Sequence, residues 1–428
     1  MKRYIVNILN VLNKIKEGGN IVNGLLFSIY SFINRGISFF LLLILANYIT
    51  PEEYGYLSLW GTVVSIVGYF ISLSSDGYME ISYFKNSKEG IANSFSGVLT
   101  IMFIIGGLFI LLLVMFGENI SNILNLPISS LYLAVVISFF TVLSNLNLNL
   151  FRIQEKVQMY GFLSVTNAVL NFILSVIFVK YFLFGWFGRT CAQSLCSVIY
   201  GFLGFIIFVR NKYFIKPNWH FLKNMLIWGI PLIPHLATNF IRQGCDRYII
   251  NSTHSVEYVG LFSFALNIAN IIIMVGLGFN QSNSVDIYKV LGNKTMSNHD
   301  KKLHLRKQRL YIGLIYGVIS LIVLLFSYFI IPLLLPNYEN FKNYFAILSI
   351  YAFFQCMYYL YTNYLFYYNK THLIMYVTFF SSLLHLLLSL LFTRYSLYYT
   401  CFIYCLSQFL VFLIIKYYAN RELNNKLG

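Results

Sequence analysis

Charged residues are scarce in this sequence, and acidic residues are the scarcest among them. Only 10% of the 428 residues are Asp, Glu, Lys or Arg, and 14 acidic residues stand against 30 basic ones. Hydrophobic residues make up 58%, so the chain has too few polar side chains to cover the surface of a water-soluble globule. This composition excludes a soluble protein and indicates one that is embedded in a lipid bilayer.

The sequence also lacks the signatures of an enzyme or a metal site. It has no G-x-S-x-G, no H-E-x-x-H and no Gly-rich phosphate loop with its lysine, and no connection is long enough for a soluble catalytic domain. None of the six cysteines forms a C-x-x-C pair, so we interpret them as small apolar packing residues. We therefore expect no catalytic residues, no metal and no bound cofactor.

Long apolar runs fill most of the chain. A helix needs about 20 apolar residues to cross the hydrocarbon core of a bilayer. Runs of that length occur over residues 21–48, 56–83, 91–117, 128–150, 158–181, 183–210, 221–250, 256–282, 306–332, 341–366, 371–393 and 396–418. The sequence therefore predicts an all-α integral membrane protein with about twelve transmembrane helices.

Basic residues are distributed unevenly between the predicted loops. If the N-terminus is cytoplasmic, 23 of them lie on the inside, whereas the outer loops hold only Lys180, Lys342 and Arg394. Cytoplasmic loops of membrane proteins carry such an excess of Lys and Arg, so we expect both termini to be cytoplasmic. Because the basic residues are spread over many short loops and form no single patch, we expect no nucleic-acid partner.

A short internal repeat divides the chain into two related halves. The segment Tyr54–Leu59 (YGYLSL) matches Val259–Phe264 (VGLFSF) at an offset of 205 residues, close to half the chain. We predict two parallel six-helix bundles, over residues 21–215 and 216–420, with a cleft between them. Residues 1–20 lack the apolar core of a signal peptide and are expected to form an interfacial or cytoplasmic lead-in, and residues 421–428 a cytoplasmic tail.

Arg35 lies near the middle of the first apolar run. A charged side chain at the centre of a membrane helix costs about 2.5 to 3.5 kcal/mol, so Arg35 should face a partner or a wet cavity. Asp76 in the second run could pair with Arg35 in a buried structural pair. Burial would also raise the pKa of Asp76, which makes this carboxylate a candidate for coupling to protons.

Three charged residues stand close together in the seventh run. Arg242 and Asp246 are spaced i, i+4, so on a continuous helix they would share a face and could form a salt bridge, whereas Arg247 would point elsewhere. Asp246 is thus a second structural or coupling carboxylate, and Arg247 needs another explanation, either snorkelling or a ligand.

The same run carries two prolines, Pro231 and Pro234. Each removes a backbone hydrogen bond, so we expect a bent helix that takes part in gating. His235 and His385 could titrate, although a neutral histidine bonded to a neighbouring helix is the commoner arrangement. Seven tyrosines between Tyr351 and Tyr368 are typical of an aromatic belt at the membrane interface, with stacking on sugar rings as the alternative.

Short motifs in this chain resemble those of a known family. They are the PEEYG turn within Ile37–Leu59, then GIPLIP at residues 229–234, and DRYII followed by EYVGLFSF at residues 246–264. These segments resemble the polysaccharide-exporting branch of the MOP superfamily and are similar to O-antigen flippases. The resemblance implies two six-helix bundles in a MATE-like inverted V around a central cavity, in a multi-pass protein of the bacterial inner (cytoplasmic) membrane.

By the same resemblance, the substrate is an oligosaccharide linked to undecaprenyl pyrophosphate, which moves from the inner to the outer leaflet. Arg35, Arg242 and Arg247 would then line the cavity and bind the pyrophosphate. A proton or sodium gradient would drive transport, and the polymerase and chain-length proteins of the same pathway would be partners beside the bilayer itself.

Two other classes of membrane protein share this composition. A multidrug exporter, or an exporter of another lipid-linked precursor, would have the same fold, but drug cations favour acidic cavity residues and this chain has more arginine than carboxylate at depth. A polytopic glycosyltransferase or polymerase would be expected to have a long outer loop, and the predicted outer loops are all short. The half-chain repeat also favours a transporter.

Overall fold

The computed structural model describes residues 20–427, apart from residues 74, 231–237, 239 and 243. Helices make up almost all of these residues, and the described part contains no strand, which confirms the all-α prediction. Within it, eleven helices are long and apolar enough to cross a membrane. At the position of the remaining predicted span, residues 221–250, the structure describes only short helical pieces at each end. The chain divides into two compact units.

Unit 1 comprises Met1–Tyr48 and Val63–Ile233. Its helices are α2 (Asn20–Leu45), the second part of α3 (Pro51–Ser72), α4 (Ser75–Leu124), α5 (Ile128–Ile153), α6 (Val157–Val176), the π-helix η1 (Ile177–Tyr181), α7 (Gly185–Arg210) and α8 (Trp219–Gly229). Helix α5 packs along α4 and α7, and α2 packs along α6. Stacked rings of Phe95 and Phe208, with centroids 3.9 Å apart, fill part of the core between α4 and α7.

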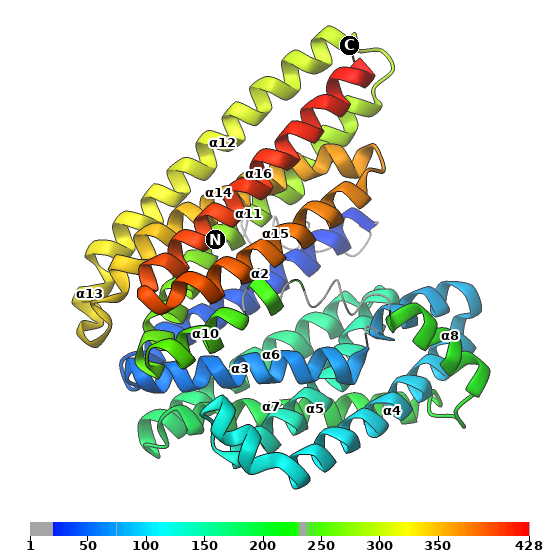
Figure 1. Cartoon of the computed structure of the whole chain (residues 1–428). Coiled ribbons are helices and arrows are strands. Elements are labelled where there is room, and N and C mark those ends of the chain that lie inside the picture. Colours follow the sequence, from blue (N-terminus) through cyan, green and yellow to red (C-terminus); the bar gives the residue numbers. More distant parts are fainter. Residues whose placement is uncertain (1–19, 74, 231–237, 239, 243, 428) are drawn as a thin grey trace, which may run out of the picture. The chain divides into compact units, whose positions relative to one another are not determined.

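Unit 2 comprises Ile49–Thr62 and Pro234–Gly428. It holds the start of α3 with α10 (Cys245–Thr253), α11 (Val256–Gly292), α12 (Asn298–Phe329), α13 (Ile331–Leu334), the 3-10 turn η3 (Pro336–Tyr338), α14 (Phe341–Tyr367), α15 (Thr371–Phe392), the 3-10 turn η4 (Thr393–Tyr395) and α16 (Leu397–Leu427). Helix α14 packs along both α11 and α16 and forms the centre of this unit (Figure 1).

Helix α3 begins with a well-defined N-terminal cap. The Thr50 backbone N–H donates to Glu53 Oε2 at 2.9 Å, and the Glu53 N–H donates back to Thr50 Oγ1 at 3.2 Å. This reciprocal pair is a capping box, and Pro51 at the first helical position has no N–H that would need a partner. Tyr338 from η3 donates its hydroxyl to the carbonyls of Ile49 and Thr50 at 3.0 and 3.1 Å. Burial raises the pKa of Tyr338, so its hydroxyl keeps the proton for these bonds.

The two copies of the internal repeat meet inside unit 2. A methyl group on Gly55 would overlap the backbone carbonyl of Val256, and one on Gly260 would overlap that of Pro51. The two contacts are reciprocal, because the offset of 205 residues that relates Ser58 to Ser263 also relates Pro51 to Val256 and Gly55 to Gly260. Small residues allow such close approach of two helix backbones in membranes.

The compact units end at positions other than the boundaries predicted for the bundles, residues 21–215 and 216–420. Residues 49–62 belong to unit 2 because the start of α3 packs on α11, as the repeat contacts show. Residues 216–233 belong to unit 1, since Phe221 and Trp228 of α8 pack on Tyr78 of α4 with ring centroids 5.4 and 5.8 Å apart.

The polar stretch from Asn283 to Arg309, which follows the apolar run 256–282, is mostly helical. Helix α11 continues to Gly292 and α12 already begins at Asn298, so only residues 293–297 link them. The Ser297 hydroxyl accepts a hydrogen bond from the Asp300 backbone N–H at 3.1 Å and caps α12. The polar sequence of this stretch therefore reflects helix ends that extend beyond the apolar core, and it does not form a long loop.

Candidate functional site

A group of polar side chains lies inside unit 2, among apolar and aromatic residues. Its members are Asp246 of α10, Ser263 of α11, His385 of α15, and Ser407 and Gln408 of α16, and none is more than 1% exposed. Buried polar groups in a membrane protein are costly and are usually functional. We call these five residues the polar cluster.

A helix break places Asp246 in the polar cluster. Gly244 forms a turn that precedes α10, which begins only at Cys245. Arg242 therefore lies in the helical piece before the turn, and the i, i+4 geometry predicted for Arg242 and Asp246 does not apply. The predicted salt bridge between these two residues is absent, because each has a different partner.

Asp246 pairs with His385. Nε2 of His385 lies 2.7 Å from Oδ2 of Asp246, and Nδ1 lies 3.1 Å from the hydroxyl of Ser407. The ring of Tyr404 stands edge-to-face against the imidazole, with centroids 4.8 Å apart. Oδ1 of Asp246 has no hydrogen-bond partner among the described residues. Asp246 and His385 therefore form a pair of ionisable side chains that is fully buried inside the unit.

Arg242 donates a hydrogen bond to the side-chain carbonyl of Gln408. The residue is half-buried. Among the described residues, Arg242 has no carboxylate within salt-bridge distance. Its positive charge is therefore held inside the unit by an uncharged amide.

Arg247 is bonded to two hydroxyl groups. Its Nε donates to Ser263 Oγ at 3.2 Å, and its Nη1 donates to Thr62 Oγ1 in α3 at 3.0 Å. Ser263 also accepts a hydrogen bond from Ser58 at 2.6 Å. Arg247 thus rests on the helix crossing where the two repeats meet, and its described partners are also uncharged.

The other predicted site residues lie elsewhere or outside the described residues. Arg35 is an exposed residue of α2 in unit 1 and forms no ion pair with a described side chain. Asp76 belongs to α4, but its side chain is not among those described, so the predicted pair with Arg35 stays a prediction. Pro231, Pro234 and His235 also lie outside the described residues, and the predicted bend in their helix stays a prediction.

The interpretation of the tyrosine-rich segment as an interface belt was wrong for several of its residues. Tyr351, Tyr361 and Tyr364 are at most 7% exposed, and they pack within unit 2. The guanidinium of Arg309 lies 5.6 Å from the ring centroids of both Tyr361 and Tyr364. This arrangement is a cation–π contact inside the unit, so Arg309 covers the ring faces of Tyr361 and Tyr364 that a sugar ring would need for stacking.

Several residues of the site were missed in the sequence. Ser407 and Gln408 interrupt an apolar run of α16, LYYTCFIYCLSQFLVFLII, and that interruption was the available signal. In the sequence His385 stands as an isolated histidine, because its carboxylate partner lies 139 residues away along the chain. Thr62 carried no signal at all, because a threonine in an apolar helix usually bonds to its own backbone.

Comparison with known families and sequences identifies relatives over most of the chain. The family model described as "Polysaccharide biosynthesis protein" matches residues 22–285, and one described as "MatE" matches residues 231–391. Protein 1 of the Lsg locus of Haemophilus influenzae is 24% identical over 369 residues, which cover 84% of this chain and 88% of that protein.

Solved structures of MOP-superfamily transporters share the fold. The inward-facing conformation of a multidrug resistance MATE family transporter matches with a TM-score of 0.72 and 15% identity, over 92% of this chain and 95% of that chain. A MOP-superfamily transporter from Pyrococcus furiosus, described as having a binding pocket of reverse polarity, matches with a TM-score of 0.60 and 16% identity, over 97% and 98%. The fold is therefore the one seen in these membrane transporters, and the chain belongs to the family described as "Polysaccharide biosynthesis protein".

Proposed function

We propose that this transporter moves an oligosaccharide linked to undecaprenyl pyrophosphate from the cytoplasmic to the outer leaflet of the bacterial inner membrane by alternating access. One observation carries the proposal: Arg242 and Arg247 are held inside unit 2 by an amide and two hydroxyls, and no carboxylate of the described residues lies within salt-bridge distance of either. Positive charge that is kept in a membrane protein without a counter-ion suits an anionic ligand.

The chemistry of arginine fits a pyrophosphate. A guanidinium offers donors in a planar fork that binds two phosphate oxygens at once, and it keeps its charge at every physiological pH. Asp246 is the acidic residue nearest in sequence, but it is engaged by His385. The family match to polysaccharide biosynthesis supports a glycan as the rest of the substrate. Arg35 remains a third candidate ligand, contributed by unit 1.

We assign coupling to the pair of Asp246 and His385. Ser407, which contacts His385, is the chain neighbour of Gln408, which accepts the hydrogen bond from Arg242. A proton gained or lost at the pair would therefore change the charge beside Ser407. The next residue, Gln408, is the hydrogen-bond partner of Arg242. A sodium ion at Oδ1 of Asp246 is the alternative coupling ion, and Asp76 is the alternative carboxylate.

A flipping assay tests the proposal. The full-length protein is reconstituted in vesicles with a fluorescent undecaprenyl-pyrophosphate-linked sugar, and the fraction that reaches the outer leaflet is measured by quenching. We expect Arg242→Ala to lower the rate by about tenfold or more, as the loss of one charge-assisted contact predicts. Arg210→Ala, an exposed arginine at the end of α7, serves as the matched control and should leave the rate unchanged. Wild-type protein that fails to flip this lipid would contradict the proposal.

Drug export is the second candidate, because the MatE model matches residues 231–391 and a multidrug transporter has the same fold. The same vesicles can be loaded with a cationic dye such as ethidium. Dye export without flipping of the lipid-linked sugar would favour this second function. Loss of export in Asp246→Asn but not in Arg242→Ala would support it further, because a cationic substrate needs the carboxylate and not the arginine.

A further inference from the structure

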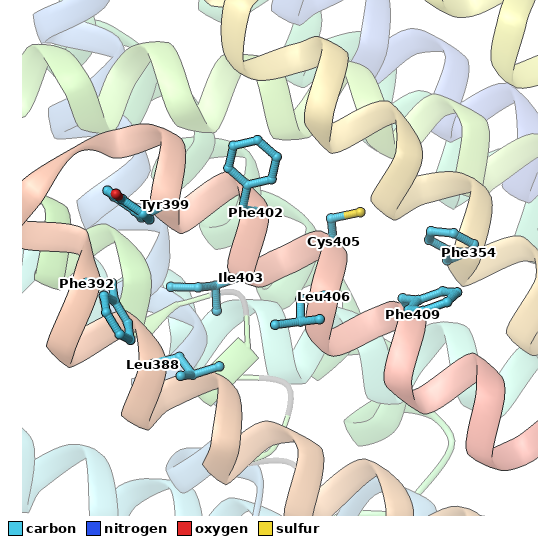
Figure 2. A pocket seen from close by; sticks show the side chains of 9 residues that line it. All are labelled: Phe354, Leu388, Phe392, Tyr399, Phe402, Ile403, Cys405, Leu406 and Phe409. Atoms are coloured by element: carbon cyan, nitrogen blue, oxygen red, sulfur yellow. The ribbon is translucent and has the colours of Figure 1, made fainter.

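An apolar cavity of about 590 Å³ lies in unit 2, between α14, α15 and α16 (Figure 2). Phe354 of α14 closes one end with Phe409, and Phe392 and Tyr399 lie toward the other end. Its volume is within the range of pockets that bind small molecules. The cavity is separate from the polar cluster, whose members do not line it.

The walls of the cavity are made of hydrocarbon and aromatic rings. Five of its nine lining residues are Phe or Tyr, and its only polar side-chain atoms are the Tyr399 hydroxyl and the Cys405 thiol. Phe402 and Leu406 are 56% and 47% exposed, so the cavity is open toward the surface of the unit. Helix α16 is long and apolar enough to cross a membrane, so its exposed apolar face is compatible with contact to lipid chains. The occupant that fits is therefore an apolar chain.

A cation lies beyond one end of the cavity. Arg394 in η4 sits over the ring of Tyr395 at 4.8 Å and donates a hydrogen bond of 2.8 Å to the hydroxyl of Tyr395. The ring of Tyr395 is in turn 6.5 Å from that of Tyr399, which lines the cavity. Arg394 is exposed and has no ion-pair partner among the described residues. An apolar cavity with an arginine at its end matches a lipid with an anionic head.

We propose that this cavity binds the isoprenoid chain of the lipid-linked substrate while its pyrophosphate lies next to Arg394, in a step of the transport cycle other than the one in which Arg242 and Arg247 hold the pyrophosphate; this inference rests on the function proposed above. Apolar character alone gives a lipid chain no reason to leave the bilayer, because the surrounding chains are equally apolar. The selectivity comes from the rings, which stack on the flat double bonds of an isoprenoid. Over an equal length of bound chain, an isoprenoid also has fewer rotatable bonds to immobilise than a saturated acyl chain.

Photo-crosslinking to the full-length protein in nanodiscs tests this site. Two probes that carry the diazirine at the same distance from the head group are compared, a labelled undecaprenyl pyrophosphate and a labelled phosphatidylglycerol, and the labelled peptides are located by mass spectrometry. We expect the isoprenoid probe to label the cavity residues of α15 and α16 about tenfold more than the phospholipid probe does, which corresponds to 1.4 kcal/mol. Cys405→Trp and Leu406→Trp should fill the cavity and abolish this preference. Leu413→Trp, an exposed residue further along α16, is the matched control and should keep it.

Arg394→Ala tests the contribution of the pyrophosphate head to binding separately from that of the isoprenoid chain. This variant should weaken labelling by the pyrophosphate probe and leave labelling by an uncharged polyprenol probe unchanged. Equal labelling by both lipid probes in the wild type, a result that needs no variant, would show a groove filled by bulk phospholipid and overturn the proposal. Unchanged isoprenoid labelling in both tryptophan variants would overturn it as well. Because binding is measured without transport, preferential labelling in a protein that fails the flipping assay would retain this site and reject the proposed function.

Discussion

Ser58 donates a hydrogen bond of 2.6 Å to Ser263, and the two serines occupy the same position in the two halves of the chain. The glycines three residues before them are equally matched, since Gly55 meets the carbonyl of Val256 and Gly260 meets that of Pro51. Equivalent residues that touch each other, flanked by reciprocal contacts, are the geometry of a local twofold axis. The axis passes between α3 and α11, at the point where Arg247 also binds.

The helix crossing should be sensitive to a single methyl group. We expect Gly55→Ala and Gly260→Ala each to lower the free energy of unfolding by about 1 to 3 kcal/mol, because the new carbon overlaps a backbone carbonyl that cannot move aside. Gly61→Ala in α3 and Gly278→Ala in α11 are the matched controls, since nothing lies within 4 Å of a Cβ at either position. Thermal unfolding in detergent measures all four. Equal melting temperatures for the two pairs would contradict the close approach.

Lysine should replace Arg247 poorly. Its Nε and Nη1 reach Ser263 and Thr62 separately, and a single ammonium group cannot reproduce both bonds in that geometry. We expect Arg247→Lys to flip the lipid-linked sugar about tenfold more slowly and Arg247→Ala to be weaker still. The comparison is made at equal amounts of protein in the membrane. A lysine variant with the wild-type rate would show that charge alone is sufficient at this position.

Substitutions at Arg35 distinguish two roles for this residue, binding the pyrophosphate and forming a structural ion pair with Asp76. If it binds the pyrophosphate, Arg35→Ala should abolish flipping, and Arg35→Lys should weaken it, because the ammonium keeps the charge but loses the fork. The second test combines Arg35→Ala with Asp76→Asn. Recovery of function in the double variant would identify a buried ion pair, since only an orphaned carboxylate is relieved by neutralisation.

Asp246 and His385 should set the dependence of transport on the proton gradient. We expect Asp246→Asn and His385→Gln to remove the stimulation by a proton gradient while leaving slow downhill movement of the lipid, because each variant lacks one of the two ionisable groups of the pair. Transport rates are measured with and without a gradient, and again with sodium on one side. A sodium dependence lost only in Asp246→Asn would assign the carboxylate to sodium. Gradient-driven transport that persists in both variants, but not in Asp76→Asn, would move coupling to Asp76.

The orientation in the membrane can be tested at the short connection between α11 and α12. A green fluorescent reporter inserted within residues 293–297 should fluoresce, and a periplasmic phosphatase inserted there should be inactive, because the flanking helix ends carry many basic residues. The same pair of reporters inserted after Tyr395 in η4 should give the opposite result. Phosphatase activity at residues 293–297 would reverse the predicted topology.

Much of the fold could be predicted from the sequence, because a bilayer demands long apolar helices with satisfied backbones. The positions of the predicted spans agree with the helices over most of the described chain, and the repeat of Tyr54–Leu59 in Val259–Phe264 led to the two segments that meet in space. The repeat did not predict that they would meet inside one compact unit. Helix packing depends on which small residues face each other, and the sequence does not contain that information directly.

The candidate site was harder to predict for a local and a tertiary reason. The local reason is Gly244, whose turn interrupts the helix and cancels the spacing argument for Arg242 and Asp246. The tertiary reason is that His385 and Gln408 come from helices far along the chain, and no periodicity links them to α10. Charges in apolar segments were correctly identified as unusual residues, whereas their partners required the structure.

The contact between α3 and α11 also imposes a delay on folding during synthesis, because α3 is made long before α11. A ribosome adds about 5 to 20 residues per second, so the 205 residues between Ser58 and Ser263 take on the order of 10 to 40 s to synthesise. During that interval α3 has been inserted, but the helix that covers Gly55 and accepts the Ser58 hydroxyl does not yet exist. The packing of unit 2 is therefore complete only when α11 binds the start of α3, a segment that entered the membrane much earlier. A nascent chain that stalls before Val256 would leave this small-residue face available to chaperones, quality-control proteases or a second copy of the same segment.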